Sequence, residues 1–345
     1  MIYSVIGLFI ALFTYLDAII KDRKFSQYSS LVILFAMLLL VSLRYRVGTD
    51  WDAYYEFYRE GTDNVEIGYA FVNNFFRSIN LPYNFFIFII NGVALTLMFF
   101  FLKRNAFFLS VGLLVFFSDL FLYYNLSAIR QGIAIAITCF SINFAIERKK
   151  TFFLISVITA ACFHTTAIAF LIVYFLPRKK ITAKAYILFL VGFLMFNIFL
   201  QSISELITLY TLKNAEFYTN QQEKVDNIVN LFYVGIIKRS IIIFLILITG
   251  KKIFNLPNVY YFFNLYMFGF AIYLCSYLIS PDIGTRLSSY FTIFEIALAG
   301  CLIYSLDSLK SRVIVASIFV IMAFYKIFAY TTFETYNYHS IIKLF

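Results

Sequence analysis

The sequence is poor in charge, in proline and in histidine. Charged residues fill 13% of the 345 positions, and the chain has only 4 prolines, 2 histidines and 1 tryptophan. A soluble domain carries about 25% charged residues, so this composition excludes an ordinary soluble fold. The 4 cysteines lie inside apolar runs, without CxxC or Cys/His metal spacing. This pattern favours small buried side chains over a zinc or redox site.

Apolar and aromatic residues are correspondingly abundant. They reach 62% and 21% of the chain, with 45 phenylalanines and 27 tyrosines. No soluble core could cover so much apolar surface, so lipid must be the solvent. A membrane span needs roughly 20 apolar residues. Spans and short loops therefore fill the chain, and we predict a single integral membrane domain over residues 1–345.

Apolar windows of 18–22 residues give the individual spans. The predicted spans are 2–20, 29–43, 83–102, 106–124, 126–146, 184–203, 231–250, 259–280, 287–305 and 313–330. The first of these lacks a basic leader and a cleavage site, which indicates a retained helix and not a signal peptide. The sequence thus predicts an all-α, polytopic transmembrane helical bundle of about 10–11 spans.

The basic residues are distributed unevenly between the loops. Sixteen of the 28 fall in one alternating set of loops, against only three acidic residues there. They are Lys21, Arg23, Lys24, Lys103, Arg104, Arg148, Lys149, Lys150, Arg178, Lys179, Lys180, Lys184, Lys251, Lys252, Lys310 and Arg312. By the positive-inside rule these loops face the cytoplasm. Topology explains the net charge of +10, and no nucleic-acid partner is expected.

One apolar run, 152–176, has basic flanks at both ends. Both ends should then be cytoplasmic, but 25 residues cannot cross the membrane twice. The rule favours a re-entrant helical hairpin that breaks near His164, and the alternative is one tilted span. With the hairpin, both termini and the loops 44–82 and 204–230 face outside. The later part of 44–82 reads as an amphipathic segment on the membrane surface.

Several cations lie where membrane proteins rarely place them. Arg130 lies about four residues into its span, and Lys238 and Arg239 lie about eight residues in, roughly 12 Å below the outer surface. Arg44, Arg46 and Arg286 lie at the outer ends of spans. Each could snorkel to headgroups, but buried charge is costly and points to function. Lys238 and Arg239 point apart, and we favour Arg239 as the one facing the interior. Arginines at one level suit a diphosphate.

Two groups could transfer a proton. Asp50 lies in the outer loop near Arg44, and His164 lies at the tip of the expected hairpin. Asp50 could instead pair with Arg44, and His164 could be a hydrogen-bonded core residue. Asp119, in the outer half of a span, is a further partner to consider.

Four segments together resemble the signatures of Wzy/EpsG-type polysaccharide polymerases. They are LRYRVGTDW at 43–51 followed by Tyr54, IRQGIA at 129–134, FHTTA at 163–167, and Arg286 with Tyr290. Each is weak alone, but the ordered set is fairly specific. Lys238 and Arg239 have no clear counterpart, so their role rests on burial alone.

The resemblance implies a GT-C-like fold and a glycosyltransferase without cofactors. No acidic DxD-like pair lies where it could hold a divalent ion, so we predict that the enzyme is metal-independent. Family members polymerise undecaprenyl-diphosphate-linked oligosaccharide units into O-antigen, capsule or exopolysaccharide at the outer face of the bacterial inner membrane. Asp50 or His164 would then be the catalytic base. The expected diphosphate or glycan ligands are Arg44, Arg130, Gln131, Arg239, Arg286 and Tyr290. The bilayer is one partner, and a chain-length regulator and a flippase are further candidate partners.

The sequence leaves three other functional classes open. A flippase for the same lipid needs charges at several depths and usually shows repeat symmetry, which the sequence does not show. An O-antigen ligase uses the same donor but typically carries a larger late outer loop. An outer-leaflet acyltransferase could use His164 but needs an acyl tunnel.

Overall fold

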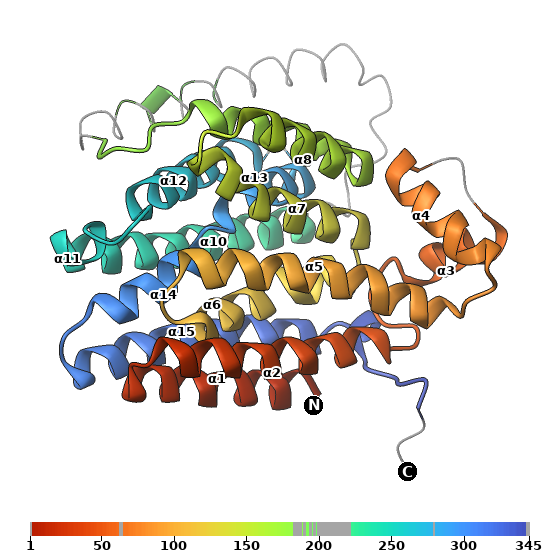
Figure 1. Cartoon of the computed structure of the whole chain (residues 1–345), viewed down its shortest axis with the longest axis horizontal. Coiled ribbons are helices and arrows are strands. Elements are labelled where there is room, and N and C mark those ends of the chain that lie inside the picture. The colour runs from red at the N-terminus through yellow and green to blue at the C-terminus, as the bar shows by residue number, and fades with distance from the viewer. Residues whose placement is uncertain are drawn as a thin grey trace.

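The computed structural model describes residues 2–61, 65–181, 222–278 and 280–342, together with positions 188, 191, 192, 195 and 198. In these parts of the chain the only extended pairing is one isolated antiparallel bridge between Arg44 and Ser340. All other regular structure there is helical (Figure 1). The predicted all-α membrane bundle is therefore confirmed.

The helices follow one another with short connections. The N-terminal half contains α1 (Ile2–Ile20), α2 (Arg23–Ser42), α3 (Trp51–Glu60), α4 (Ile67–Ser78), α5 (Tyr83–Asn105), α6 (Leu109–Phe116), the π-helix η1 (Phe117–Asn125), α7 (Ile129–Ile146), α8 (Lys150–Phe163) and the 3₁₀-helix η2 (Thr165–Phe175). The C-terminal half contains α10 (Gln222–Thr249), α11 (Lys251–Phe254), α12 (Val259–Ser276), α13 (Pro281–Thr292), α14 (Glu295–Ser305), α15 (Leu309–Thr331) and η4 (Glu334–Tyr336).

Seven of the described helices are long and apolar enough to cross a membrane, or up to eight if one bent pair counts as a span. The seven match seven of the predicted spans. The predicted span 287–305 is wrong as a single helix, because α13 and α14 meet at a bend of 46°. Segment 106–124 forms the shorter α6 and η1. Most of segment 184–203 and most of loop 204–230 lie outside the described residues, and 222–230 belongs to α10.

Helix boundaries follow local capping chemistry. The α1–α2 turn ends at Asp22, whose carboxylate accepts a hydrogen bond of 2.9 Å from the backbone amide of Lys24. Ser280 caps α13 in the same way, and Pro281 follows at the first helical position. Both arrangements satisfy amide groups that a helix start leaves without partners.

The basic loops gather at one end of the bundle, which we call the basic end. Contacts between distant loops show this directly. They are a 2.9 Å hydrogen bond from Arg23 to the carbonyl of Lys103, the Arg104–Glu147 and Lys252–Asp307 ion pairs, and Lys21 over the ring of Tyr304. Residues 43–50, 126–131, 164–166 and 335–341 meet at the opposite end, which we call the site end (Figure 1).

Residues 150–178 leave the basic end and return to it. Helix α8 ends at Phe163, the chain turns at His164, and η2 runs back along α8. Arg178 then donates a hydrogen bond of 3.0 Å to the carbonyl of Ile146, at the end of α7. This segment therefore consists of two short helices joined at His164, with both outer ends on the basic side.

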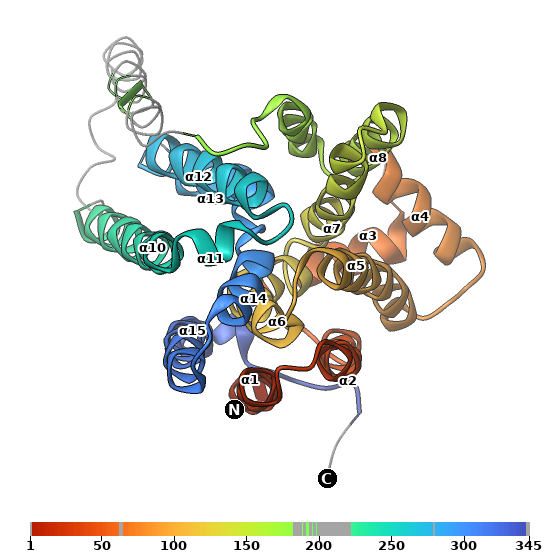
Figure 2. The ribbon, with the colours of Figure 1, turned by 60° about the vertical axis from the view of Figure 1, so that its left-hand side comes forward.

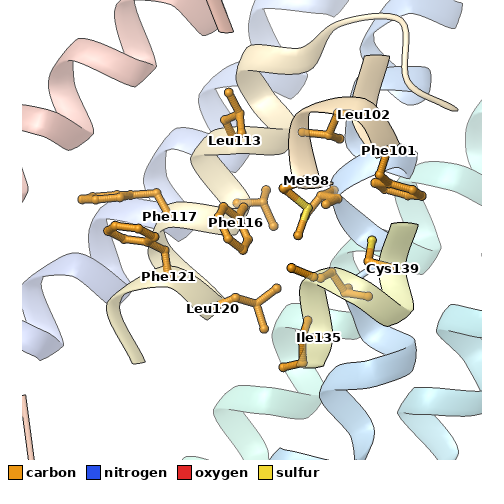
Figure 3. Close-up of a cluster of buried hydrophobic side chains, with 14 of the residues drawn as sticks. Met98, Phe101, Leu102, Leu113, Phe116, Phe117, Leu120, Phe121, Ile135 and Cys139 are labelled. Atoms are coloured by element: carbon orange, nitrogen blue, oxygen red, sulfur yellow. The ribbon is translucent and has the colours of Figure 1, made fainter. Parts of the chain in front are cut away.

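Helices α6 and η1 form the centre of the bundle. Every side chain of α6 is buried, and α1, α2, α14 and α15 surround it (Figure 2). Figure 3 shows side chains of α5, α6, η1 and α7 packed together around Met98 and Phe116. A Cβ on Gly112 would lie 2.5 Å from the carbonyl oxygen of Ile296, so only glycine permits this close approach to α14.

The site end is covered by the segment between α2 and α5. Short helix α4 occupies the predicted amphipathic stretch, α3 precedes it, and both project beyond the end of α5 (Figure 1). The C-terminal segment runs alongside residues 43–48, where the amide of Tyr45 donates to the carbonyl of His339 at 2.8 Å. This covering layer brings Tyr54 and Glu66 over the helix ends.

Candidate functional site

Glu66, directly before α4, joins two side chains from distant parts of the sequence. Its Oε2 forms an ion pair with Nη1 of Arg130, at the start of α7. Its Oε1 lies 2.9 Å from Nδ1 of His164, at the turn between α8 and η2. The site end of the bundle thus holds a carboxylate, a guanidinium and an imidazole in direct contact.

Helix α3 adds an aromatic side to this group. The Nε of Arg130 donates to the hydroxyl of Tyr54 at 3.3 Å, and the guanidinium lies 5.8 Å from the centre of that ring. Asp50 lies one turn earlier, at the start of α3, where its carboxylate accepts a 2.9 Å hydrogen bond from the Thr49 hydroxyl. Asp50 is therefore near the group without joining it directly.

Arg286 approaches from the other side, on α13. Its Nη2 donates to the hydroxyl of Tyr123 on η1 at 3.3 Å, and its Nε lies 3.8 Å from the exposed carboxylate of Asp282. Its backbone carbonyl accepts a 2.9 Å hydrogen bond from Nε2 of Gln131. Gln131 thereby ties α13 to α7 next to Arg130.

Tyr290 links the same helix to the returning arm of the hairpin. Its ring is fully buried, and its hydroxyl lies 3.2 Å from the hydroxyl of Thr166. Because Thr166 follows His164 by two residues, this contact fixes the hairpin tip against α13. The structure therefore brings together Arg130, Gln131, His164, Arg286 and Tyr290, which come from separate sequence motifs.

The charged side chains of this group act on one another. Arg130 and Arg286 both act electrostatically on His164, while Glu66 is the acidic partner shared by Arg130 and His164. Burial alone would raise the pKa of Glu66, but hydrogen bonds and the charge of Arg130 outweigh it and lower this pKa. Glu66 thus stays ionised at neutral pH. Both guanidinium groups remain partly exposed, so the site can accept an anion.

Arg44 has different surroundings. It is 1% exposed and donates from Nη1 to the carbonyls of Val47, at 3.0 Å, and Leu126. Aromatic residues Tyr3, Tyr83, Tyr336 and Tyr338 act on its charge. The structure places Arg44 inside the covering layer, where it joins the loop after α2 to the end of η1.

Lys238 and Arg239 lie on α10. Lys238 forms an ion pair with Asp119 of η1, and its Nζ lies 3.1 Å from Oε1 of Glu295 on α14. The Arg239 guanidinium lies 3.8 Å from the centre of the Tyr273 ring. The sequence favoured Arg239 as the inward-facing residue, yet Lys238 makes the interior ion pairs. One of its partners is Asp119, which the sequence analysis named as a candidate partner.

Sequence reasoning did not single out Glu66. Its only local signal is its place directly before the amphipathic segment, where an acidic residue reads as an ordinary helix start. Its partners lie 64 and 98 residues away, and no local pattern encodes such contacts. Within the described ranges, no group of three or more His, Cys, Asp or Glu side chains could hold a metal ion.

An apolar helical bundle with a polar site at one end defines the chain as a polytopic membrane protein. Comparison with family models identifies its family. The chain belongs to the EpsG family, whose model matches residues 27–343. The predicted resemblance is confirmed over nearly the whole chain. Membership in this family supports a general role of the polysaccharide-polymerase type in the membrane. No curated protein and no solved structure matches the chain.

Proposed function

We propose that this protein is a membrane glycosyltransferase that polymerises undecaprenyl-diphosphate-linked oligosaccharide repeat units. The growing glycan leaves its lipid carrier and moves onto the terminal sugar of an incoming unit. The observation that carries this proposal is the meeting of Glu66, Arg130 and Arg286 around His164, at the end of the bundle opposite the basic loops. By the positive-inside rule that end faces the periplasm or the outside.

Arg130 and Arg286 bind the diphosphate in this proposal. Guanidinium groups form paired hydrogen bonds with phosphate oxygens and stay charged in a desolvated site. When the anomeric bond breaks, negative charge develops on the leaving diphosphate, and two fixed cations stabilise it. They supply the positive charge that a divalent ion supplies in other sugar transferases, so we expect activity to persist in the presence of a chelator.

His164 is the general base in this proposal. Glu66 is ionised, so it accepts a hydrogen bond from Nδ1–H of His164, which leaves Nε2 as the proton acceptor. As the acceptor hydroxyl attacks the anomeric carbon, its proton passes to Nε2 and the sugar–diphosphate bond breaks. Asp50 is the alternative base. We favour His164 because it contacts the carboxylate that also binds Arg130.

The position of the site bears on the flippase, and the acceptor bears on the ligase. A flippase binds its cargo along a path across the membrane, whereas Arg130 and Arg286, the residues proposed to bind the diphosphate, lie near one end of the bundle. A ligase uses the same lipid-linked donor but transfers the glycan to a different acceptor. Arg130 and Arg286 serve both reactions, so the nature of the acceptor separates polymerase from ligase.

Reconstitution tests the proposal. The full-length protein in proteoliposomes is supplied with undecaprenyl-diphosphate-linked repeat units, and products are resolved by size. We expect a ladder of glycan lengths with or without EDTA, and its loss in Arg130→Ala, Arg286→Ala and His164→Ala. Arg59→Ala and His339→Ala are matched controls, because Arg59 pairs with Glu60 on the surface and His339 is exposed. Absence of chain growth with folded protein would overturn the polymerase assignment.

A further inference from the structure

Three ionisable side chains from three helices meet inside the bundle, away from Glu66 and His164. Lys238 Nζ forms an ion pair with Asp119 and lies 3.1 and 3.4 Å from the two carboxylate oxygens of Glu295. The side chains of Lys238, Asp119 and Glu295 are 18%, 15% and 6% exposed. Charges inside a membrane bundle are costly and indicate function by default.

The two carboxylates belong to the elements that position Arg286. Asp119 lies four residues before Tyr123 on η1, and the Tyr123 hydroxyl lies 3.3 Å from Nη2 of Arg286. Glu295 is the first residue of α14, directly after the 46° bend that joins it to α13, the helix of Arg286. Lys238 therefore connects η1, which carries Tyr123, with α14, which directly follows the helix of Arg286.

The charges of the three side chains explain why Lys238 holds η1 and α14 together. Two ionised carboxylates close together in a low-dielectric interior repel each other strongly, and a cation between them reverses that effect. Arg239 and Lys326 act on Glu295 from a greater distance. The direct bonds to both carboxylates come from Lys238.

Helix α10 has few other means of holding this position. Few of its described side chains are fully buried within the bundle. Its polar contacts also include hydrogen bonds that Arg239 donates to the Gly235 carbonyl and that the Tyr273 hydroxyl donates to the carbonyls of Leu231 and Phe232. Lys238 joins α10 to η1 and α14 through its ion pairs.

We propose that Lys238 is a positioning residue for the diphosphate site: by bridging Asp119 and Glu295 it keeps η1 and the α13–α14 bend together and so orients Arg286. The inference rests on the proposed function, because it assigns Arg286 to the diphosphate. Lys238 itself does not contact the ligand. Removing its charge leaves two carboxylates facing each other, separates η1 from α14 and weakens the Tyr123–Arg286 contact.

The test measures binding of undecaprenyl diphosphate, as the probe, to the full-length protein in nanodiscs, with thermal stability recorded for each variant. We expect Lys238→Met to weaken binding roughly tenfold, as for residues of one ion-pair network. Lys238→Arg restores binding because it keeps the bridge. Lys238→Met with Asp119→Asn and Glu295→Gln also restores most of it, because no carboxylates remain to repel. Lys252→Met, which removes an exposed lysine–aspartate pair at the basic end, leaves binding unchanged.

The outcomes separate this inference from the proposed function. If Arg286→Ala weakens binding while folded Lys238→Met binds normally, Lys238 does not position Arg286 and the inference is wrong. If Arg286→Ala binds the probe normally, the assignment of Arg286 to the diphosphate is wrong, and the inference falls with it. If the triple variant binds as weakly as Lys238→Met, repulsion between the carboxylates is not the cause, which also overturns the inference.

Discussion

Nδ1 of His164 lies 2.9 Å from Oε1 of Glu66, although 98 residues separate them in the chain. The hairpin brings His164 to the site end, and the covering layer between α2 and α5 brings Glu66 over it. The same carboxylate also binds Arg130. One acidic residue therefore fixes the orientation of the proposed base and of a proposed phosphate ligand.

Replacing His164 should abolish catalysis without unfolding the protein. A positioned general base contributes about 10²- to 10⁴-fold to a rate, so we expect His164→Asn to lose at least about 100-fold in polymerisation. Initial rates in proteoliposomes measure this, with His339→Asn as the control. If His164→Asn keeps its rate and Asp50→Asn loses it, Asp50 is the base.

Glu66 should give the protein a pH-dependent stability. Its pKa is lowered in the folded protein, so its ion pair stabilises the fold above the usual glutamate pKa and this contribution is lost as pH falls through the folded value. Melting temperatures of wild type and Glu66→Gln should differ at pH 7 and converge as the pH falls through the lowered pKa of the folded protein. The exposed Glu60→Gln is the control. A difference that grows at low pH would contradict the assignment.

Arg44 should matter for folding more than for ligand binding. Its buried guanidinium bonds the carbonyls of Val47 and Leu126, and hydrogen bonds to charged groups are worth about 1.5–3 kcal/mol each. We expect Arg44→Ala to lower the melting temperature and the yield of folded protein. Exposed Arg46→Ala should do neither. If folded Arg44→Ala has normal stability but loses diphosphate binding, Arg44 is a ligand instead.

Gly48 is expected to tolerate no side chain. Its φ of +98° is unfavourable for other residues, and a Cβ there would lie 2.2 Å from the carbonyl oxygen of Leu126. Gly48→Ala should therefore displace the covering layer and lower thermal stability and activity together. Gly92→Ala is the control, because its Cβ would meet only Leu38 methyl groups at 4.0 Å. Equal stability of the two variants would show that the covering layer adapts.

The membrane fold could be predicted because it depends on composition and on loop charge. Long apolar runs between basic loops gave seven helices that the structure contains. The bend between α13 and α14 could not be predicted, because residues 287–305 read as one apolar run. The break there places buried Glu295 next to Lys238, a tertiary contact that hydropathy does not encode.

The site was predictable where its residues belong to motifs. Arg130, Gln131, His164, Arg286 and Tyr290 were each expected as site residues, and they meet at one end of the bundle. Glu66 was missed because its importance comes from distant partners. The direction of the Lys238 side chain was inferred from its angle to Arg239 on the same helix. The carboxylates that bind Lys238 come from two other elements, which this angle does not reveal.

The most direct test of the account removes the gene from its native strain and separates the surface glycan by size. If the protein polymerises repeat units, the ladder collapses to a single repeat on its acceptor, and the wild-type gene but not a His164→Asn version restores it. Loss of every repeat, including the first, would contradict the account in favour of a flippase or ligase. An unchanged ladder would place the protein outside this pathway.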